Sequence, residues 1–541
     1  MSIYRLLHFL SFVVYVNCMS FTLVLPTNNV DVLKDALENV SNPDSINYRN
    51  YWSLDKLRDI SKSDKDIREP IIDWLNFNNI PFIDNSDSFR CFGNVTNIFD
   101  IFKLKNGHIV FPSVFHNRVM FVEGLKKNNF TKIKPKKSKV SNSVDSRYAG
   151  LEVLERVYNF STSSVNGSVA SIEYQGNSGF NQSDLCASAI LNNLKCDNVT
   201  KIIGENVYPD TETELDMQME QLVAPNSDIW FWDDTAWLLS FATNFSNTKD
   251  IPKVISMSWG WSEDSQCNIT SCGNLTSQDY VERVGQEYVK MGLRGVSILV
   301  SSGDAGAPGR TNEECAEDRP VNPVLPGGSE YITSVSATFI ALDNKTVNWK
   351  SPLCKNDGCI TGIKEYPTNF NDTQWTTGGG FSIYVNETPK WQKSAVNGYF
   401  SSGVKLPNKF NRNGRGYPDV SMVGHNCPVI IGGSLEAVDG TSCSSPLFAG
   451  VVAKLNDLER KKGKETLGFL NPLLYKMSLE DSSIFNDVVE GNNYCTEYNC
   501  CPTRKDKGSD FGYIATKGWD PVTGLGTPNV DKMIEFLDRK N

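Results

Sequence analysis

The chain has 541 residues, of which 40% are hydrophobic and 21% are charged. It is too long for one ordinary domain and has enough apolar side chains for a large core, so we expect more than one folded unit. The formal net charge of −10 at pH 7 argues against a nucleic-acid-binding protein, because nucleic-acid phosphates require a basic surface.

Residues 1–20 predict a cleaved secretory signal peptide. Arg5 precedes an apolar run over residues 6–16, which is followed by small or polar residues and is too short to span a bilayer. A buried N-terminal helix is the alternative. No later run reaches transmembrane length, so we expect a lysosomal or secreted product of the secretory pathway without a membrane span. Thirteen Asn-x-Ser/Thr sequons support this route and predict a glycoprotein: Asn39, Asn94, Asn129, Asn159, Asn166, Asn181, Asn198, Asn244, Asn268, Asn274, Asn344, Asn371 and Asn386.

Residues 21–125 predict a small α+β domain. Helical periodicity covers residues 30–40 and 66–77, and short apolar runs follow at 99–104 and 108–115. Residues 126–146 then contain seven lysines between Lys126 and Lys139, interrupted by polar residues and a proline. Such a basic stretch is typical of an exposed linker, and its position between two patterned regions makes it an accessible site for proteolytic processing.

Residues 147–541 alternate between helices and short β-rich runs. The strand candidates are 253–258, 296–301 and 429–431, and the helix candidates are 278–291 and 444–458. This alternation favours an α/β domain in which helices cover both faces of a parallel sheet.

The fourteen cysteines also support entry into the secretory pathway, where disulfides form. Closely spaced members predict loop staples, although spacing does not determine their pairing: Cys267 with Cys272, Cys354 with Cys359, and the group Cys495, Cys500 and Cys501. A zinc site is the competing explanation, and it fails because histidine ligands are scarce.

A candidate nucleophile lies between residues 439 and 446. Gly440 permits a tight turn, and Ser442 falls at or just before the start of an apolar helix, where free amides and the helix dipole favour negative charge. A serine there could form a tetrahedral intermediate. A helix N-cap is the alternative role for this serine.

The histidines limit the choice of general base. His8 lies in the signal, and His108 and His116 lie in the N-terminal domain. If that domain is removed, only His425 remains, in an apparent loop seventeen residues before Ser442. A histidine-based triad therefore has little support. A carboxylate can replace imidazole if the enzyme works at acidic pH.

Two carboxylates suit this role. Glu212 and Asp216 are four residues apart and would share one helix face, so their mutual repulsion would raise one pKa and allow a shared proton. Ordinary capping of the helix N-terminus is the alternative. Glu214, on a different face of the helix, serves as the internal control.

A third acid, Asp304, directly follows an apolar run that predicts a buried strand. Loops at the carboxyl ends of parallel strands commonly form active sites. Asp304 is flanked by Gly303 and Gly306, could reach a reacting carbonyl, and if protonated could donate to its oxyanion. A plain Asp-Gly turn is the alternative.

The order Glu212, Asp216, Asp304, Ser442 resembles the sedolisin family of serine-carboxyl peptidases, and within it the tripeptidyl-peptidases. The likeness covers nearly the whole chain after the signal. Its supporting segments are residues 254–260, 378–382, 416–420, 467–472 and 518–526. Residues 47–54, continuing to 74–75, look like the inhibitory propeptide of the family.

The resemblance implies a subtilisin-like catalytic domain in which Ser442 attacks the peptide bond and Glu212 acts as general base and acid. Asp216 would orient Glu212, and Asp304 would support the oxyanion. The expected activity is release of tripeptides from the free N-terminus of polypeptides during lysosomal proteolysis. An acid endopeptidase of the same family is one alternative, and a catalytically silent glycoprotein that acts as a binding module is another.

The resemblance also implies one structural calcium ion. Its ligands would be the carboxylates of Asp487 and Asp520 and the backbone carbonyls of Val488, Thr516 and Gly518, and such hard oxygen donors suit Ca²⁺. The expected partners of the protein are peptide and protein substrates and the chain's own propeptide, which would act as an inhibitor.

Three positions depart from the family pattern. Asp439 stands where a small residue is usual, Cys443 replaces a common alanine, and Ala305 replaces a common serine. None of them removes a catalytic group, although Asp439 could alter the pH profile because it lies beside the nucleophile.

Overall fold

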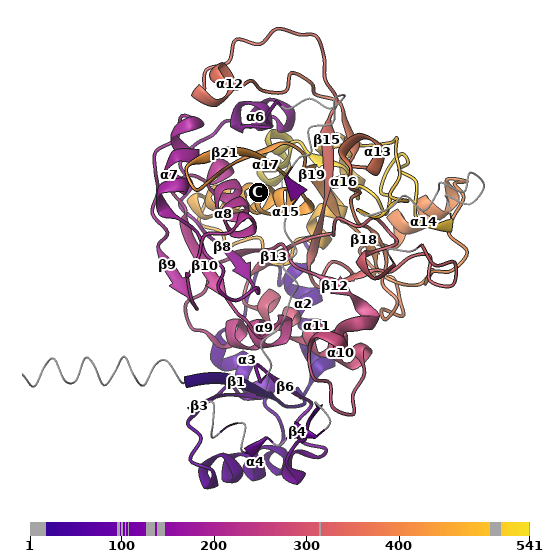
Figure 1. Ribbon diagram of the computed structural model, residues 1–541. Coiled ribbons are helices and arrows are strands. Elements are labelled where there is room, and N and C mark those ends of the chain that lie inside the picture. Colours follow the sequence, from indigo (N-terminus) through magenta and orange to yellow (C-terminus); the bar gives the residue numbers. More distant parts are fainter. Residues whose placement is uncertain are drawn as a thin grey trace, which may run out of the picture.

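The structure is a computed structural model that describes residues 18–94, 98, 101–102, 104–105, 108–125, 136–137, 147–312, 315–497 and 510–539. The expected signal segment, apart from residues 18–20, and most of the linker lie outside these residues. A small N-terminal domain lies at one end of a larger α/β domain (Figure 1). Among the described helices, none is long and apolar enough to cross a membrane.

The N-terminal domain is the predicted α+β unit. Its antiparallel sheet has the strand order β2-β3-β1-β6, with bounds β1 Cys18–Val24, β2 Phe82–Asp84, β3 Ser88–Asn94 and β6 Phe121–Glu123. Its helices are α2 Val30–Ser41, α3 Leu54–Ser61 and α4 Lys65–Phe77, which confirms the two predicted helical segments. The two apolar runs form only short elements, β4 Leu104–Lys105, β5 His108–Ile109 and a 3₁₀ turn at Ser113–Phe115. The sheet includes residues 18–20, which the sequence analysis assigned to the signal.

The larger domain contains an eight-stranded sheet in the order β16-β15-β13-β11-β8-β10-β9, with β19 also paired to β15. All of these pairings are parallel except that of β16 with β15. The bounds are β8 Ser168–Glu173, β9 Lys201–Ile203, β10 Asp228–Asp233, β11 Val254–Met257, β13 Ser297–Ser301, β15 Thr333–Ile340, β16 Glu365–Pro367 and β19 Val420–Val423. The parallel sheet confirms the expected α/β class.

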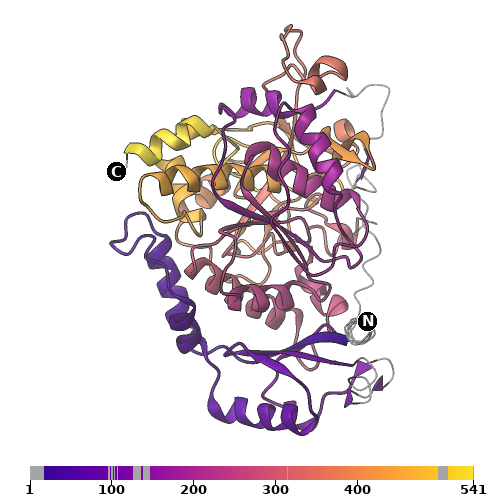
Figure 2. The ribbon, with the colours of Figure 1, turned by 90° about the vertical axis from the view of Figure 1, so that its left-hand side faces the viewer.

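Helices cover both faces of this sheet (Figures 1 and 2). Helices α8 and α15 pack on the face that includes Val169 and Val254, whereas α9 and α11 pack on the face that includes Ala170 and Ile255. Neighbouring residues point to opposite faces because side chains alternate along a strand. The helices are α6 Leu151–Tyr158, α7 Gln182–Leu191, α8 Thr211–Val223, α9 Leu238–Asn247, α10 Gln266–Ile269, α11 Ser277–Leu293, α12 Pro352–Asn356, α13 Phe370–Thr373, α14 Lys393–Ser401, α15 Thr441–Lys461, α16 Asn471–Glu480 and α17 Val530–Arg539.

The third predicted strand lies outside the main sheet. Residues 429–431 belong to β20 Cys427–Ile431, which forms a hairpin with β21 Ser434–Asp439. The linker adds a third strand to this hairpin, because β7 Lys136–Lys137 pairs with the end of β21. The other short pairs are β12 Trp261–Ser262 with β14 Val324–Leu325, β17 Gly380–Phe381 with β18 Gly416–Tyr417, and β22 Phe485–Asn486 with β23 Thr527–Pro528.

An apolar interface joins the two domains. Helix α2 packs against α11, and Figure 2 shows the indigo helical segment running along the larger domain. The shared cluster contains Leu33, Leu37, Val40 and Leu57 from the N-terminal domain and Val289, Leu293 and Phe469 from the larger one. Tyr51 lies against Gly295 and Gly468, where an added Cβ would come within 2.6 Å and 2.3 Å of its side chain. Glycine at these two positions therefore permits the close approach.

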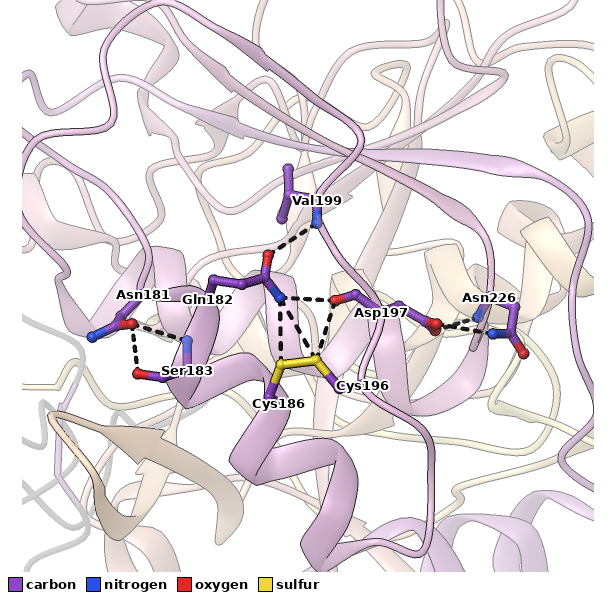
Figure 3. Close-up of a disulfide and its surroundings, with 8 residues drawn as sticks. All are labelled: Asn181, Gln182, Ser183, Cys186, Cys196, Asp197, Val199 and Asn226. Atoms are coloured by element: carbon purple, nitrogen blue, oxygen red, sulfur yellow. Dashed lines mark hydrogen bonds between the residues drawn. A yellow bond between two sulfur atoms is a disulfide. The ribbon is translucent and has the colours of Figure 1, made fainter.

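Disulfides connect segments of the larger domain. Two of the predicted pairs are present, Cys267–Cys272 and Cys354–Cys359, and two more are Cys186–Cys196 and Cys427–Cys443. At the Cys186–Cys196 bond, the Gln182 amide donates to the backbone oxygen of Asp197 at 2.8 Å (Figure 3). Cys495 is also disulfide-bonded, whereas Cys500 and Cys501 lie outside the described residues.

Candidate active site

A pocket lies at the carboxyl ends of β11 and β13, where α8 and α15 begin. Its lining includes Glu212, Ser258, Trp259, Asp304, Arg310 and Ser442. The candidate nucleophile and two of the three candidate acids thus line one pocket although they are far apart in the sequence. Asp216 lies one helical turn behind Glu212 on α8.

Helix α8 places the two candidate acids on one buried face. Asp210 caps the helix by accepting the backbone amides of Glu212 and Thr213 at 3.0 and 3.2 Å. Burial raises the pKa of Glu212 to about 8, although a hydrogen bond with the Ser442 side chain partly opposes this rise. Glu212 and Ser442 therefore lie close together in the pocket, and Glu212 Oε1 is buried without a hydrogen-bond partner among the described residues.

Asp216 is completely buried behind this pair. The Ser258 hydroxyl donates to Asp216 Oδ1 at 2.8 Å, whereas Asp216 Oδ2 has no hydrogen-bond partner among the described residues. Burial raises the pKa of Asp216 well above its ordinary value, and the charge of Glu212 raises it further. Two interacting carboxyls of this kind lose their protons in two steps, so one proton can be shared between them.

Glu173 is a fourth buried acid that the sequence analysis did not identify. It ends strand β8 and accepts the Trp259 indole N–H at 2.8 Å. Burial and then the charge of Asp216 raise the pKa of Glu173 well above its ordinary value. An acid at the carboxyl end of a buried strand was the signal used for Asp304, and the same signal would have found Glu173.

Asp304 lies directly behind the nucleophile turn. Its Oδ1 accepts the backbone amide of Thr441 at 2.9 Å and the Thr441 hydroxyl at 2.7 Å. Its Oδ2 is 3.5 Å from Arg310 Nη2, and Arg310 Nε donates to Glu497 at 2.6 Å. Asp304 is thus held beside Ser442, and Arg310 is a cation at this site that the sequence analysis missed.

Ser442 is the second residue of α15 and is 6% exposed. The preceding turn is held from one side by a single loop: Gly440 N donates to Gly424 O at 2.9 Å, and Cys443 forms the disulfide with Cys427. The helix start supplies free backbone amides close to the serine. These amides could donate hydrogen bonds to the oxyanion that forms when Ser442 attacks a carbonyl during acyl transfer.

His425 contacts other groups than the nucleophile. Its Nδ1 lies 2.9 Å from Asp439 Oδ1, and its ring meets Phe339 edge to face. Asp439 also accepts the backbone amide of Asn426 at 2.8 Å. Asp439, which departs from the family pattern, therefore contacts His425. The described contacts of His425 do not include Ser442.

Glu214 points away from Ser442, but it is more than a surface control. It is buried and accepts the backbone amide of Asn181 at 2.6 Å and the Gln218 amide at 2.9 Å. Burial raises its pKa to about 8. An alanine at this position would leave buried donors without an acceptor, so glutamine is the better control substitution.

The linker strand lies beside the nucleophile segment. In its antiparallel pairing with β21, Lys137 is opposite Val438 and Lys136 is opposite Asp439, which lies three residues before Ser442. No described residue of the N-terminal domain lines the pocket. The linker strand β7 therefore lies beside the nucleophile segment, whereas the described residues of the folded N-terminal domain do not reach the pocket.

The expected calcium ligands lie near the C-terminus of the larger domain. Asp520 is buried, its Oδ1 accepts the amides of Val522 and Thr523, and its Oδ2 accepts the amide of Thr516 at 2.9 Å. Burial raises its pKa to about 8, and the charge of Asp487 adds to this rise. Two neighbouring carboxyls with backbone carbonyls close to them in the sequence suit a hard cation. Among the described residues, no three His, Cys, Asp or Glu side chains are arranged to hold a metal ion, so carbonyl oxygens would have to complete the shell.

Comparison with known proteins gives matches over almost the entire chain. Residues 17–109 match the family model described as Pro-kumamolisin, activation domain. Physarolisin from Physarum polycephalum is 36% identical over 95% of this chain and 92% of its own length. Tripeptidyl-peptidase 1 from Mus musculus is 27% identical over 96% of this chain and 91% of its own length. Tripeptidyl-peptidase 1 from Dictyostelium discoideum is 29% identical over 66% of this chain and 52% of its own length.

The fold has a counterpart among solved structures. Pseudomonas sedolisin, a serine-carboxyl proteinase complexed with two molecules of pseudo-iodotyrostatin, superposes with a TM-score of 0.54 and 22% identity. The match covers 73% of this chain and 99% of that one. At this level of identity the likeness concerns the fold, and it agrees with the α/β class expected from the sequence.

Proposed function

Because the chain belongs to the sedolisin family of serine-carboxyl peptidases, which are serine-type peptidases, we propose that it releases tripeptides from the free N-terminus of polypeptides at acidic pH. The observation that carries this proposal is that Ser442, Glu212 and Asp304 line one pocket, with Asp216 one helical turn behind Glu212. The relatives named tripeptidyl-peptidase 1 support the tripeptide product.

In the proposed mechanism, Ser442 Oγ attacks the peptide carbonyl and transfers its proton to Glu212. The oxyanion forms beside Asp304, which donates a hydrogen bond when protonated, and near the amides at the start of α15. Glu212 then returns the proton to the leaving amine, and the C–N bond breaks to give an acyl-enzyme. Water hydrolyses the acyl-enzyme with Glu212 again as the base. Asp216 is the second member of the pair with Glu212. When the two carboxyls share one proton, one of them is a base and the other an acid.

The products of a long peptide test this proposal. Acid-treated protein is incubated at about pH 4, near the ordinary carboxyl pKa, with one peptide that has a free N-terminus and with its acetylated twin. We expect tripeptides from the free peptide alone. Internal fragments from both peptides would identify an acid endopeptidase, and no cleavage by protein that retains its fold would favour a silent binding module. The Ser442→Ala variant is the control for contaminating peptidases.

The N-terminal domain is proposed to act as the chain's own inhibitory propeptide, with residues 126–146 as the processed linker. Support comes from the activation-domain match and from β7, which covers the edge of β21 next to the nucleophile segment. Precursor purified at neutral pH should be inactive and should shorten after a shift to about pH 4 to a chain that begins between residues 126 and 150. Efficient shortening of pure Ser442→Ala precursor would show that a different protease performs the cleavage.

One Ca²⁺ ion is proposed at Asp487 and Asp520, with the carbonyls of Val488, Thr516 and Gly518 completing its shell. Bound there, the ion would neutralise the buried carboxylate of Asp520 and the exposed carboxylate of Asp487 and tie the C-terminal segments together. Support comes from the charge of Asp487, which raises the pKa of Asp520, and from the open space around the α-carbon of Gly518. Elemental analysis should find one calcium per chain, and Asp520→Ala should be poorly secreted. A calcium-free protein of normal stability would contradict the site.

The proposed place of action is the lysosome or the extracellular space. Support comes from the sequons, the disulfides and the acid chemistry of the pocket. Deglycosylation of secreted protein and microscopy of the tagged chain would test this route, and a cytosolic, unglycosylated product would contradict it.

A further inference from the structure

Helix α8 carries a third acid on the same face as the proposed catalytic pair. Glu212, Asp216 and Glu220 follow one another at intervals of four residues, so each lies about one turn below the previous one. Asp216 and Glu220 are both 0% exposed. The mechanism above uses the first two acids and assigns no role to Glu220.

The upper level of this stack contains Asp216. On the sheet beneath it, Ile172 of β8 is paired with Met257 of β11, so Glu173 and Ser258 lie side by side at the carboxyl ends of these strands. Ser258 donates to Asp216 Oδ1 at 2.8 Å. Asp216 is thus level with the last polar residues of the two strands.

The lower level contains Glu220. Four residues along an α-helix advance it by about 6 Å, close to the roughly 6.6 Å covered by two residues of a strand. One helical turn below Asp216 therefore corresponds to the serine pair Ser171 and Ser256, which face each other on β8 and β11. Ser256 Oγ lies 2.8 Å from Ser445 Oγ on α15. Hydroxyls from three elements consequently form a buried polar layer at the level of Glu220.

Several atoms at the junction of the two levels lack partners. Both carboxyl oxygens of Glu220, Ser171 Oγ and Asp216 Oδ2 are buried without a hydrogen-bond partner of good geometry among the described residues. Long side chains on a helix point back toward its N-terminus, which directs Glu220 toward Asp216. A charge on Glu220 would raise the pKa of Asp216, as expected for two carboxyls one helical turn apart.

Glu220 is kept neutral by its surroundings. Burial raises its pKa well above the ordinary value, and only the Ser171 hydroxyl opposes this rise. The titratable groups nearest in this arrangement are the acids Asp216 on α8 and Glu173 on β8, whereas β11 and α15 contribute hydroxyls. On α7, Asp184 is bound by the amides of Gly432 and Gly433 instead. An orphaned buried acid costs stability, so its presence requires an explanation.

We propose that Glu220 carries a proton and donates it as a hydrogen bond to Asp216 Oδ2, directly or through one water molecule. Glu220 is then a positioning residue, because it fixes the carboxyl that orients the general base and does not touch substrate. This inference rests on the proposed function only because it takes Asp216 to be the neighbour of the general base. The hydrogen bond from Glu220 to Asp216 does not depend on which peptide the enzyme cleaves.

Two substitutions separate this role from packing. Glu220→Met keeps the volume and removes the donor, and we expect kcat to fall about tenfold or more with KM nearly unchanged, because Asp216 is no longer held in place. A hydrogen bond to the ionised form of Asp216 is lost as well, so Asp216 keeps its proton to higher pH and the alkaline limb of the kcat/KM profile moves upward. Glu220→Gln retains an N–H donor and should stay within about threefold of the wild-type kcat.

Gln221→Met is the matched control, because the neighbouring Gln221 is also buried and its Nε2 also lacks a partner among the described residues. Its kcat and pH profile should not change. The proposal is overturned if folded Glu220→Met keeps the wild-type kcat and pH profile, whatever its stability. It is also overturned if Glu220→Gln loses as much activity as Glu220→Met.

A spectroscopic measurement covers the case in which Glu220→Met does not fold. The infrared difference spectrum between wild type and Glu220→Gln at pH 6 should contain the carbonyl band of one protonated carboxyl, and its absence would refute the proton on Glu220. Failure of the tripeptide product leaves these measurements intact, since any cleaved peptide reports kcat. Failure of the Glu220 variants leaves tripeptide release intact, so the two proposals fail separately.

Discussion

The interface between the two domains and the α8 face of the active site both contain fully buried carboxyl groups, with opposite consequences. At the interface, Asp87 lies 2.8 Å from Lys290 Nζ and 3.2 Å from Arg283 Nη2. Burial alone would raise its pKa, but the charges of Lys290 and Arg283 outweigh that effect and lower it. On α8, Asp216 and Glu220 lack such partners, and burial raises their pKa values.

This contrast shows that the neighbouring charge, rather than burial, decides which acids remain ionised in an acidic compartment. Asp87 stays charged where Glu220 is protonated, so acidification does not simply dissolve the interface. Release of the propeptide would then depend on its more exposed ion pairs, such as Glu38 with Lys390, and on the linker at β7. The following four expectations test the two regions in turn.

The largest effect is expected at the active site. Ser442→Ala and Glu212→Gln should each reduce kcat by a factor on the order of 10⁴ or more, because each removes a member of one reacting unit. Initial rates with a long free peptide measure this. Glu214→Gln, on the same helix, should remain active. Near-normal rates for Ser442→Ala would contradict its assignment as the nucleophile, and near-normal rates for Glu212→Gln would contradict its assignment as the base.

The next effect is expected at the interface. Asp87→Asn leaves Arg283 and Lys290 facing only Glu287, and breaking a buried ion cluster in this way costs about 3–5 kcal/mol. In an inactive Ser442→Ala precursor, thermal unfolding should show a less stable propeptide.

The exposed pair of Asp44 with Lys476 provides the matched control for Asp87. Asp44→Asn should leave the unfolding curve nearly unchanged, because exposed ion pairs contribute little. Equal effects of the two substitutions would show that the cations at Asp87 do not outweigh its burial.

A smaller effect concerns Glu123, which also lies at the interface and accepts the Thr270 hydroxyl at 2.5 Å. Burial raises its pKa from 4.5 to about 8. A raised pKa means that its contribution to stability is complete below about pH 4.5 and is lost as the pH rises through about 8. The free energy of unfolding of the inactive precursor should therefore fall with rising pH by at most about 1.4 kcal/mol per pH unit from this group. Glu123→Gln should flatten that dependence, and an unchanged slope would contradict the protonated state.

The smallest effect is expected for His425→Ala. The imidazole pairs with Asp439 rather than with Ser442, so we expect the loss of kcat to stay below about tenfold. Rates should be compared at matched amounts of protein shown to be folded by circular dichroism. An inactive folded variant would restore a histidine-based mechanism.

The sequence predicted much of the fold because its signals are local. Apolar periodicity located α11 and α15, and the short apolar runs located β11 and β13, each within a few residues of the observed bounds. The strand at residues 429–431 was correct as a strand, but its place in a hairpin outside the main sheet was not predicted. Pairing partners depend on tertiary contacts that a local pattern does not contain.

The site was predicted where chemistry follows from position along the chain. Residue order and the resemblance named Glu212, Asp216, Asp304 and Ser442, and the structure brings these residues together, while their roles stay predictions. Arg310 was missed because its meaning depends on Glu497, almost two hundred residues later. The burial of Glu214 was missed for a similar reason, since its acceptor role depends on the turn at residue 181.

The Cys427–Cys443 disulfide places an oxidation step within the assembly of the catalytic machinery. Cys443 directly follows Ser442, so the covalent bond to β20 fixes the start of α15. Both sulfurs are fully buried, which means that the bond must form while the chain is still folding. A chain produced in a reducing cytosol would have the same residues but would lack this tie next to its nucleophile. The activity of the expressed protein should therefore depend on the compartment in which it folds. Active protein should come from hosts that oxidise cysteines during secretion.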